Sequence, residues 1–225
     1  MKSILLTACL CLAGSLAFSQ VCDFYYFRDG KTIELTFYNK KGDESGKSIY
    51  KVSDVKKSGS TTSGTIQSEV FDKKGKSIAK ATNNIKCNGG ELLIDLKMFM
   101  SSEQAGQIKA DASASDSYLS YPAIMKTGDV LPDGKLHLNI DQNNGMKSVV
   151  DIDITERKVG EKETVTTPAG TWECFKITYH SVVKITMMGI GIPIRSDVTE
   201  WFAPGFGPVK TESSKGGTTL LTKFQ

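Results

Sequence analysis

The chain has 225 residues and a formal net charge of +3 at pH 7, from 28 Lys and Arg against 25 Asp and Glu. Its basic pairs are scattered along the sequence, which argues against a nucleic-acid-binding protein, because such proteins gather basic residues on one face. Roughly two hundred residues remain once a leader is removed, enough for one sizeable hydrophobic core. We therefore expect a single domain that spans residues 21–225.

Residues 1–20 have the features of a secretory signal peptide. Lys2 is the only charged residue before Asp23, and an apolar run of about fifteen residues extends from Ile4 to Phe18. Small residues at the end of this run suit signal peptidase, with a mature start near Val21. The sequence thus predicts an exported protein, either periplasmic or secreted.

Cys9 offers an alternative, because Leu6 to Cys9 has the form of a lipobox that would anchor the protein to the outer membrane through a lipid. The apolar run continues past Cys9, however, where a lipobox normally gives way to a polar linker. No later segment reaches the eighteen or so apolar residues that a membrane-spanning helix needs. We expect a free mature chain that does not span a membrane.

Three cysteines remain in the expected mature chain, in a compartment that permits disulfides. Cys22 lies at the mature N-terminus and Cys87 in a glycine-rich turn, whereas Cys174 lies in a strand between Trp172 and Phe175. A thiol in such a strand behaves as a small buried apolar group. We predict a disulfide between Cys22 and Cys87, with Cys174 free.

Alternation of apolar and polar residues is the main secondary-structure signal, as in Ile33 to Phe37, Leu136 to Ile140 and Val150 to Ile154. This period of two predicts half-buried strands, and the short glycine-containing turns between them require antiparallel pairing. Tyr38 to Gly42 and Phe71 to Gly75 share one turn pattern, an aromatic residue, an amide or acid, two lysines and glycine. Both are predicted hairpin tips.

A short helix is predicted from Ser101 to Ala110, with Ser102 as its N-cap and Glu103 in its first turn. Two apolar runs are of functional interest, since methionine adapts to irregular ligands and such runs can line or rim an apolar cavity. Taken alone, the same residues also fit ordinary core filling with a hairpin loop from Gly189 to Pro193. The candidate ligand-binding residues in these runs are Met98, Phe99, Met100, Met187, Met188, Ile190 and Ile192.

No catalytic signature is present, and no nucleotide-binding or metalloprotease motif. His137 and His180, the two histidines, have no acid or cysteine at a mechanistically useful spacing, which favours solvated surface positions. Acidic and amide side chains that could bind a hard cation are better explained as the wet face of a strand and a hairpin turn; they are Asp141, Asn143, Asn144, Asp151 and Asp153. We expect no metal site, no cofactor and no enzymatic activity.

The segments Glu163 to Ile177 and Glu200 to Lys210 resemble those of the uncharacterised TapB-like exported proteins of Bacteroidota, which are themselves similar to a widespread domain of unknown function. The resemblance includes Cys87 to Gly90 and Gly128 to Gly134 and covers nearly the whole mature chain. It implies an all-β fold, a long curved antiparallel sheet that forms a half-barrel or open barrel with one or two short helices, similar to periplasmic lipoprotein and lipid carriers. Pro208 departs from the pattern and predicts an edge or a bulge.

The resemblance brings no catalytic residues to carry over. Our leading hypothesis is a non-enzymatic exported protein that binds or carries a hydrophobic small molecule, such as a lipid or acyl chain, inside its curved sheet. The alternative is a structural or assembly partner at the cell envelope, which docks a protein through exposed strand edges.

Overall fold

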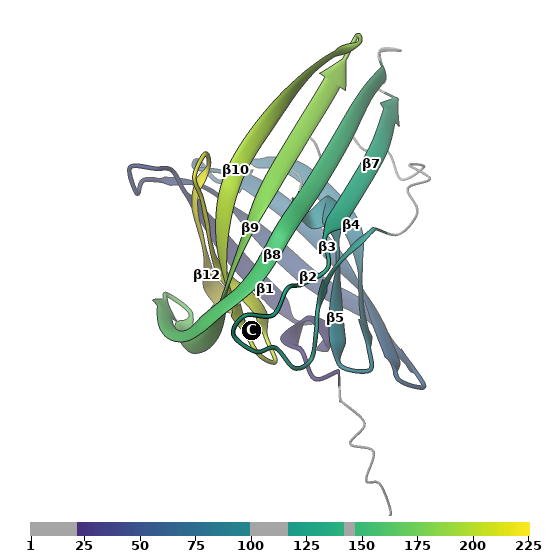
Figure 1. Ribbon diagram of the computed structural model, residues 1–225, viewed down its shortest axis with the longest axis vertical. Helices are drawn as coiled ribbons and strands as arrows, with labels where there is room; N and C mark the ends of the chain where they lie inside the picture. Colours follow the sequence, from purple (N-terminus) through teal and green to yellow (C-terminus); the bar gives the residue numbers. More distant parts are fainter. Residues whose placement is uncertain (1–21, 100–116, 142–146) are drawn as a thin grey trace, which may run out of the picture.

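Twelve antiparallel strands form one sheet that curves into an almost closed barrel (Figure 1). The structure is a computed structural model that describes residues 22–99, 117–141 and 147–225. The predicted signal peptide, the predicted helix from Ser101 to Ala110 and the Asn144-Gly145 turn lie outside the described residues. The expected all-β class and curved antiparallel sheet are confirmed.

The strands follow one another around the barrel in chain order, apart from one closing pair. Their bounds are β1 (Thr32–Tyr38), β2 (Glu44–Ser58), β3 (Thr61–Asp72), β4 (Ser77–Asn88), β5 (Glu91–Asp95), β6 (Tyr118–Tyr121), β7 (Gly134–Asp141), β8 (Lys147–Thr167), β9 (Gly170–Met187), β10 (Ile190–Ala203), β11 (Gly207–Ser213) and β12 (Gly217–Phe224). Two short 3-10 helices accompany them, η1 (Tyr25–Phe27) and η2 (Leu96–Phe99). Neither short helix in this part of the chain has the length and apolar character needed to cross a bilayer.

The first and last strands pair in the middle of the sheet, so the two edges of the sheet are β6 and β7. These edges meet at a seam that the β6–β7 connection closes. The amide of Gly128 donates to the carbonyl of Val159 at 2.8 Å, and the amide of Leu131 to that of Arg157 at 2.9 Å. A side chain at Gly134 would collide with Leu119 of β6, so β7 and β6 lie in close contact there.

One end of the barrel, here the closed end, is filled by aromatic side chains from η1 and the neighbouring strands and turns. Phe206 is central: its ring lies 5.2 Å from that of Tyr25, 4.9 Å from Trp172 and 5.4 Å from Phe224 between centroids. Tyr26 packs on it at 6.0 Å. Aromatic rings bury large apolar areas and favour such edge and stacked contacts, so this cluster closes the barrel from below.

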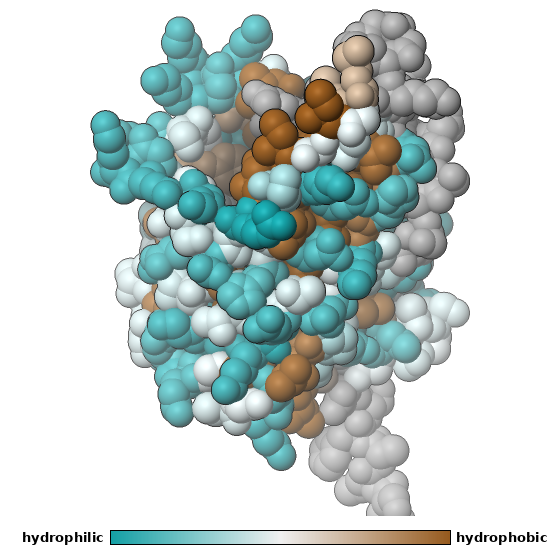
Figure 2. Space-filling view, turned by 45° about the horizontal axis from the view of Figure 1, so that its top comes forward, coloured by the Kyte–Doolittle hydropathy of each residue, from teal (hydrophilic) through white to brown (hydrophobic). Residues whose placement is uncertain are grey.

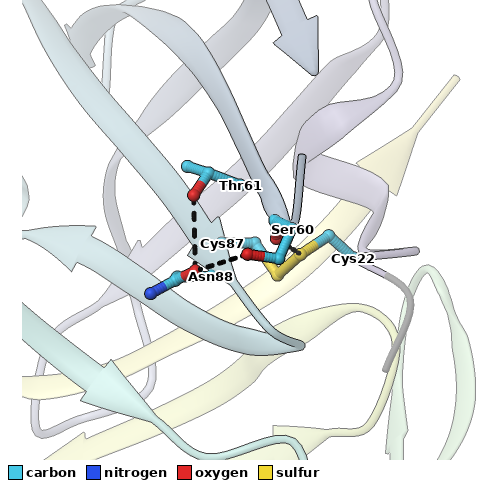
Figure 3. Close-up of a disulfide and its surroundings, with 5 residues drawn as sticks. All are labelled: Cys22, Ser60, Thr61, Cys87 and Asn88. Carbon is cyan, nitrogen blue, oxygen red and sulfur yellow. Dashed lines mark hydrogen bonds between the residues drawn. A yellow bond between two sulfur atoms is a disulfide. The ribbon is translucent and has the colours of Figure 1, made fainter. Parts of the chain in front are cut away.

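A disulfide joins Cys22 and Cys87 at the closed end, as the sequence predicts (Figure 3). It ties the chain before η1 to the end of β4, across 65 residues. Beside it, the Ser60 hydroxyl donates to the Asn88 side-chain oxygen at 3.2 Å, which links two neighbouring turns. Cys174 is buried and free, and burial raises its thiol pKa to about 12.

The opposite end, here the open end, carries the β1–β2, β3–β4, β9–β10 and β11–β12 turns. The two predicted lysine-containing tips have the same geometry there. The Asn39 side-chain oxygen accepts from the amides of Lys41 and Asp43, and the Asp72 carboxylate accepts from those of Lys74 and Lys76. Both turns need a positive φ in the same place, which glycine supplies: Gly42 has φ 84° and Gly75 φ 78°. The repeated sequence pattern is therefore a repeated turn.

Two local expectations have different outcomes. The residues from Gly189 to Pro193 do not form a loop, because Met188 and Gly189 alone make the turn, both with positive φ, and β10 begins at Ile190. Such two-residue turns match the twist of the paired strands. The bulge predicted near Pro208 is confirmed, since the β10–β11 register shifts opposite this proline.

Candidate functional site

The β9–β10 hairpin rises at the open end and exposes large apolar side chains. Met188 is 84% exposed, Ile190 72% and Ile192 70%, and Met187 and Ile194 are about half exposed. We call these five residues the apolar tip. Figure 2 shows apolar side chains gathered in the upper part of the face that is turned forward. Contiguous exposed apolar groups of this size are uncommon on soluble monomers and mark interaction or binding sites.

The apolar tip continues into the barrel as an apolar wall on the inner face of β7 to β10. Strand register aligns two rows of side chains, Leu138, Val150, Ile185 and Ile192 in one row and Leu136, Ile152, Val183 and Ile194 in the other. Within the first row, Leu138 and Val150 are buried, Ile185 is half-buried and Ile192 is exposed. The inner surface thus becomes accessible toward β10 and the open end.

The wall on the other side of the barrel, from β1 to β4, mixes large apolar inner side chains with small and polar ones. The small and polar ones are Ser48, Ser68, Ala79, Ala81 and Asn83, and Leu35 and Val70 lie in the same row as Ser48. Tyr50 lies among them, and burial raises the pKa of its phenol to about 12, yet its side chain is only half-buried. Inner side chains on both walls, Tyr50 on β2 and Val183 and Ile185 on β9, are thus partly accessible to solvent.

Deeper in the barrel, toward the closed end, lies a buried polar layer, made of Tyr121 (β6), Arg157 (β8), Tyr179 (β9) and Glu200 (β10). The Tyr121 hydroxyl donates to Glu200 Oε2 at 3.2 Å, and Arg157 lies over the Tyr121 ring at 4.8 Å. Burial raises the pKa of Glu200 to about 7, although Arg157 acts in the opposite direction. Burial and the nearby Glu200 raise the pKa of Tyr121 and Tyr179 well above the ordinary value.

Arg157 also holds the seam from inside the barrel. Its Nη1 donates to the carbonyl oxygens of Ser120 at 2.8 Å and Pro132 at 2.9 Å, one on each side of the seam. Its Nε and Nη2, and Glu200 Oε1, have no hydrogen-bond partner. Buried unpaired polar atoms are rare and costly. The unpaired atoms of the polar layer therefore lower the stability of the fold. The layer lies between the packed closed end and the open end.

The predicted ligand residues are divided between two places. Those of the β9–β10 hairpin, Met187, Met188, Ile190 and Ile192, lie together in the apolar tip. Met98 of η2 is half-buried and packs against the main core. Phe99 ends η2, and Met100 lies outside the described residues. The structure thus brings the hairpin residues together in the apolar tip, and it places Met98 and Phe99 in a different element, η2.

Sequence reasoning did not identify Glu200 or Arg157. The sequence did contain a signal for Glu200. The period of two places Glu200 on the same strand face as Val198 and Phe202, and an acidic residue among the apolar residues of a strand face is unusual. No such signal exists for Arg157. A register shift between Thr155 and Lys158 breaks the alternation of β8 and turns Arg157 inward.

The expected surface positions of the two histidines are confirmed, and each histidine also has an acid partner that is distant in sequence. His137 Nδ1 lies 2.5 Å from Asp151, and His180 Nδ1 lies 2.6 Å from Asp197. Both pairs are cross-strand neighbours on the outer face and are largely exposed. The partners are far away in sequence, which is why spacing along the chain did not show them. Solvent access and the outward direction favour surface pairs over a catalytic site.

Two of the acids considered for a cation site contact basic side chains or histidine. Asp151 pairs with His137, and Asp153 lies 4.0 Å from Lys135. Asn143 and Asn144 lie outside the described residues. Among the described residues, no group of three or more His, Cys, Asp or Glu side chains is arranged to hold a metal ion.

Comparison with solved structures shows the same fold in two proteins. One is a protein of Bacteroides fragilis described as exported and as having a YmcC-like fold, with a TM-score of 0.70 and 22% identity over 88% of this chain and 96% of its own. The other is described as a lipoprotein of Parabacteroides distasonis, with a TM-score of 0.74 and 20% identity over 91% of this chain and 99% of its own. Both are similar to this chain in fold.

Among curated proteins, none matches the chain. A family model described as DUF3108-like matches residues 28–224, which include all twelve strands. The match agrees with the resemblance to exported β-proteins that the sequence motifs indicate. The chain belongs to the DUF3108-like family.

Proposed function

We propose that this protein is a non-enzymatic, exported binding protein that holds an apolar ligand, such as an acyl chain or lipid, against the apolar wall of its barrel. The apolar wall carries the proposal. Its two aliphatic rows lead from buried positions on β7 and β8 to the exposed tip on β10, along the inner face of the sheet. Ligand sites of this kind are concave, mostly apolar and supplied with a few polar groups.

Several observations support the non-enzymatic and exported parts of the proposal. Glu200 is the single carboxylate of the polar layer, and its neighbours there are an arginine and tyrosines that hold the seam. The disulfide suits an oxidising compartment. The proteins of similar fold are described as exported or as a lipoprotein, which favours a periplasmic or secreted location.

Two neighbouring valines allow a matched test. Val183 faces inward in the apolar wall, and Val182, beside it on β9, faces outward; both are half-buried. Burying an amide against an alkyl chain costs on the order of 1–3 kcal/mol. We expect Val183→Asn to weaken binding of a fluorescent fatty acid by about tenfold or more, and Val182→Asn to leave it unchanged.

The measurement is a fluorescence titration with each variant, next to native mass spectrometry and lipid extraction of the protein purified from its own compartment. Recovery of a bound lipid and a selective effect of Val183→Asn would support the proposal. Absence of any bound lipid together with no binding of the fatty acid would refute it.

One observation favours the alternative, a protein that docks an envelope partner through a strand edge. β11 pairs with β10 only from Val198 onward, so the segment Ile190 to Ser196 has β9 as its one strand neighbour in the described sheet. An unpaired edge can accept a partner strand. Arg195→Pro removes a further backbone amide donor from this edge. Loss of an envelope partner in this variant, together with no binding of an alkyl probe by the unchanged protein, would favour this function.

A further inference from the structure

The apolar tip lies in a stretch without charge. From Ile185 to Ile194 no residue is charged, and the first charged residue on each strand below the tip is basic, Lys184 on β9 and Arg195 on β10. Both basic residues are exposed. Segments that insert into the interface of a lipid bilayer combine exposed apolar side chains with nearby basic residues. The aliphatic side chains contact the acyl region, and the basic ones contact the headgroup phosphates.

The other turns at the open end extend this positive character. These turns carry six exposed lysines, Lys40, Lys41, Lys73, Lys74, Lys76 and Lys215, against two exposed acids, Asp43 and Glu44, and the half-buried Asp72. The Asp72 carboxylate already accepts hydrogen bonds from two backbone amides of its own turn. On the outer face below the tip, Asp151 contacts His137, and Asp153 lies 4.0 Å from Lys135. Charge complementarity therefore favours an anionic surface.

A partner strand is a weaker candidate for the same place. The free edge of β10 includes Pro193, which has no amide hydrogen to donate, and a proline in an edge strand obstructs the addition of another strand. A lipid surface needs no backbone hydrogen bonds from the edge. The exposed side chains, rather than the edge, then make the contact.

From these observations we infer that the open end of the barrel docks on an anionic lipid surface, with the apolar tip inserted at the interface and Lys184, Arg195 and the turn lysines against lipid phosphates. This surface adjoins the apolar wall proposed for the ligand and shares Ile192 and Ile194 with it, whereas Val183 belongs to the wall alone. It would place the mouth of the barrel at a membrane, where an apolar ligand can enter or leave without crossing water.

Vesicle flotation with the purified chain tests the inference. Vesicles of phosphatidylcholine with about 30 mol % phosphatidylglycerol are compared with vesicles of phosphatidylcholine alone. We expect at least tenfold tighter binding to the anionic vesicles, lost with Met188→Ser combined with Ile190→Ser. Lys184→Gln combined with Arg195→Gln should remove most of the preference for anionic vesicles.

Ile124 and Val130 provide the matched control, because they are 65% and 78% exposed but lie in the β6–β7 connection, away from the open end. Ile124→Ser combined with Val130→Ser should bind vesicles like the unchanged protein. Equal loss in the control and tip variants, or no vesicle binding by the unchanged protein, would overturn the inference.

Two further readouts distinguish docking on a lipid surface from binding of the interior ligand and from dimer formation. Val183→Asn should retain vesicle binding even where it loses the fatty acid, so failure of the ligand site and failure of the docking surface are distinguishable. Sedimentation velocity gives the oligomeric state of each variant. If the tip variant dissociates a dimer and vesicle binding is absent, the tip is a contact between two copies and the inference is wrong.

Discussion

The two ends of the barrel differ in how their apolar residues are used. At the closed end, aromatic side chains from η1, β9, β12 and the β10–β11 turn pack on one another, and a disulfide fixes the chain terminus beside them. At the open end, the aliphatic side chains of the apolar tip are exposed and continue the apolar wall of the inner face. Because exposed apolar area costs stability, the closed end must stabilise a fold whose open end remains available for binding.

The strongest test of this comparison replaces one aromatic residue of the closed end. Phe206 is 5% exposed and contacts four aromatic rings. Phe206→Ala should lower the free energy of unfolding by about 3–5 kcal/mol, since it leaves a cavity among large rings. Urea denaturation followed by tryptophan fluorescence measures the loss.

Ile190 of the apolar tip is the control for this change. Ile190→Ala should alter the free energy of unfolding by no more than about 0.5 kcal/mol, because an exposed side chain loses little packing. Similar losses for Phe206→Ala and Ile190→Ala would show that the open end contributes to stability as the closed end does, and the comparison would fail.

The disulfide gives a second, smaller effect at the closed end. Reduction of the unchanged protein should lower its free energy of unfolding by about 2–4 kcal/mol, since the bond closes a long loop in the unfolded chain. Cys22→Ala combined with Cys87→Ala should show the same lower stability and no response to reductant. Denaturation with and without dithiothreitol measures both.

Cys174→Ala separates the assigned pairing from any other. Because Cys174 is free, this variant should keep its full response to reductant. A Cys174→Ala protein that no longer responds to dithiothreitol would contradict the pairing of Cys22 with Cys87.

The closed end could be predicted from sequence more completely than the open end, for physical reasons. Alternation and glycine turns are local signals, so the strands and the β10–β11 bulge at Pro208 were predictable, and at the open end the two lysine-containing tips were predictable for the same reason. The disulfide followed from the small number of thiols and the apolar surroundings of Cys174. Each of these depends on residues close together in the chain.

The open end depends instead on register between distant strands. The sequence identifies Met187 to Ile192 as apolar, but only pairing of β9 with β8 and β10 shows that Ile185 and Ile192 share a row with Val150. Exposure of these residues depends on how short β11 is, since it leaves the upper part of β10 without a second neighbour. Apolar patterning alone predicts burial, and here the apolar tip is exposed.

The polar layer lies between the two ends. The pH dependence of stability that arises from Glu200 tests whether the layer is part of the packed closed end or is reached by water from the open end. A glutamate in the unfolded chain loses its proton near pH 4.5, whereas folded Glu200 keeps it to about pH 7. The folded state binds more protons in this window, so its stability falls as the pH rises from about 4.5 to 7 and is constant above it. The groups that face Glu200 are Tyr26, Tyr121, Arg157 and Tyr179, and burial raises the pKa of the three tyrosines further above this window.

Glu200→Gln keeps the shape of the side chain and removes its titration. At pH 5 the variant and the unchanged protein should have similar free energies of unfolding. At pH 8 the variant should be more stable by up to about 3 kcal/mol, which corresponds to a pKa raised by roughly two units. Urea denaturation at a series of pH values measures the difference, with exposed Glu212→Gln as the control. If the difference does not grow between pH 5 and 8, water reaches Glu200 from the open end, and the polar layer belongs to the binding space rather than to the packed half of the barrel.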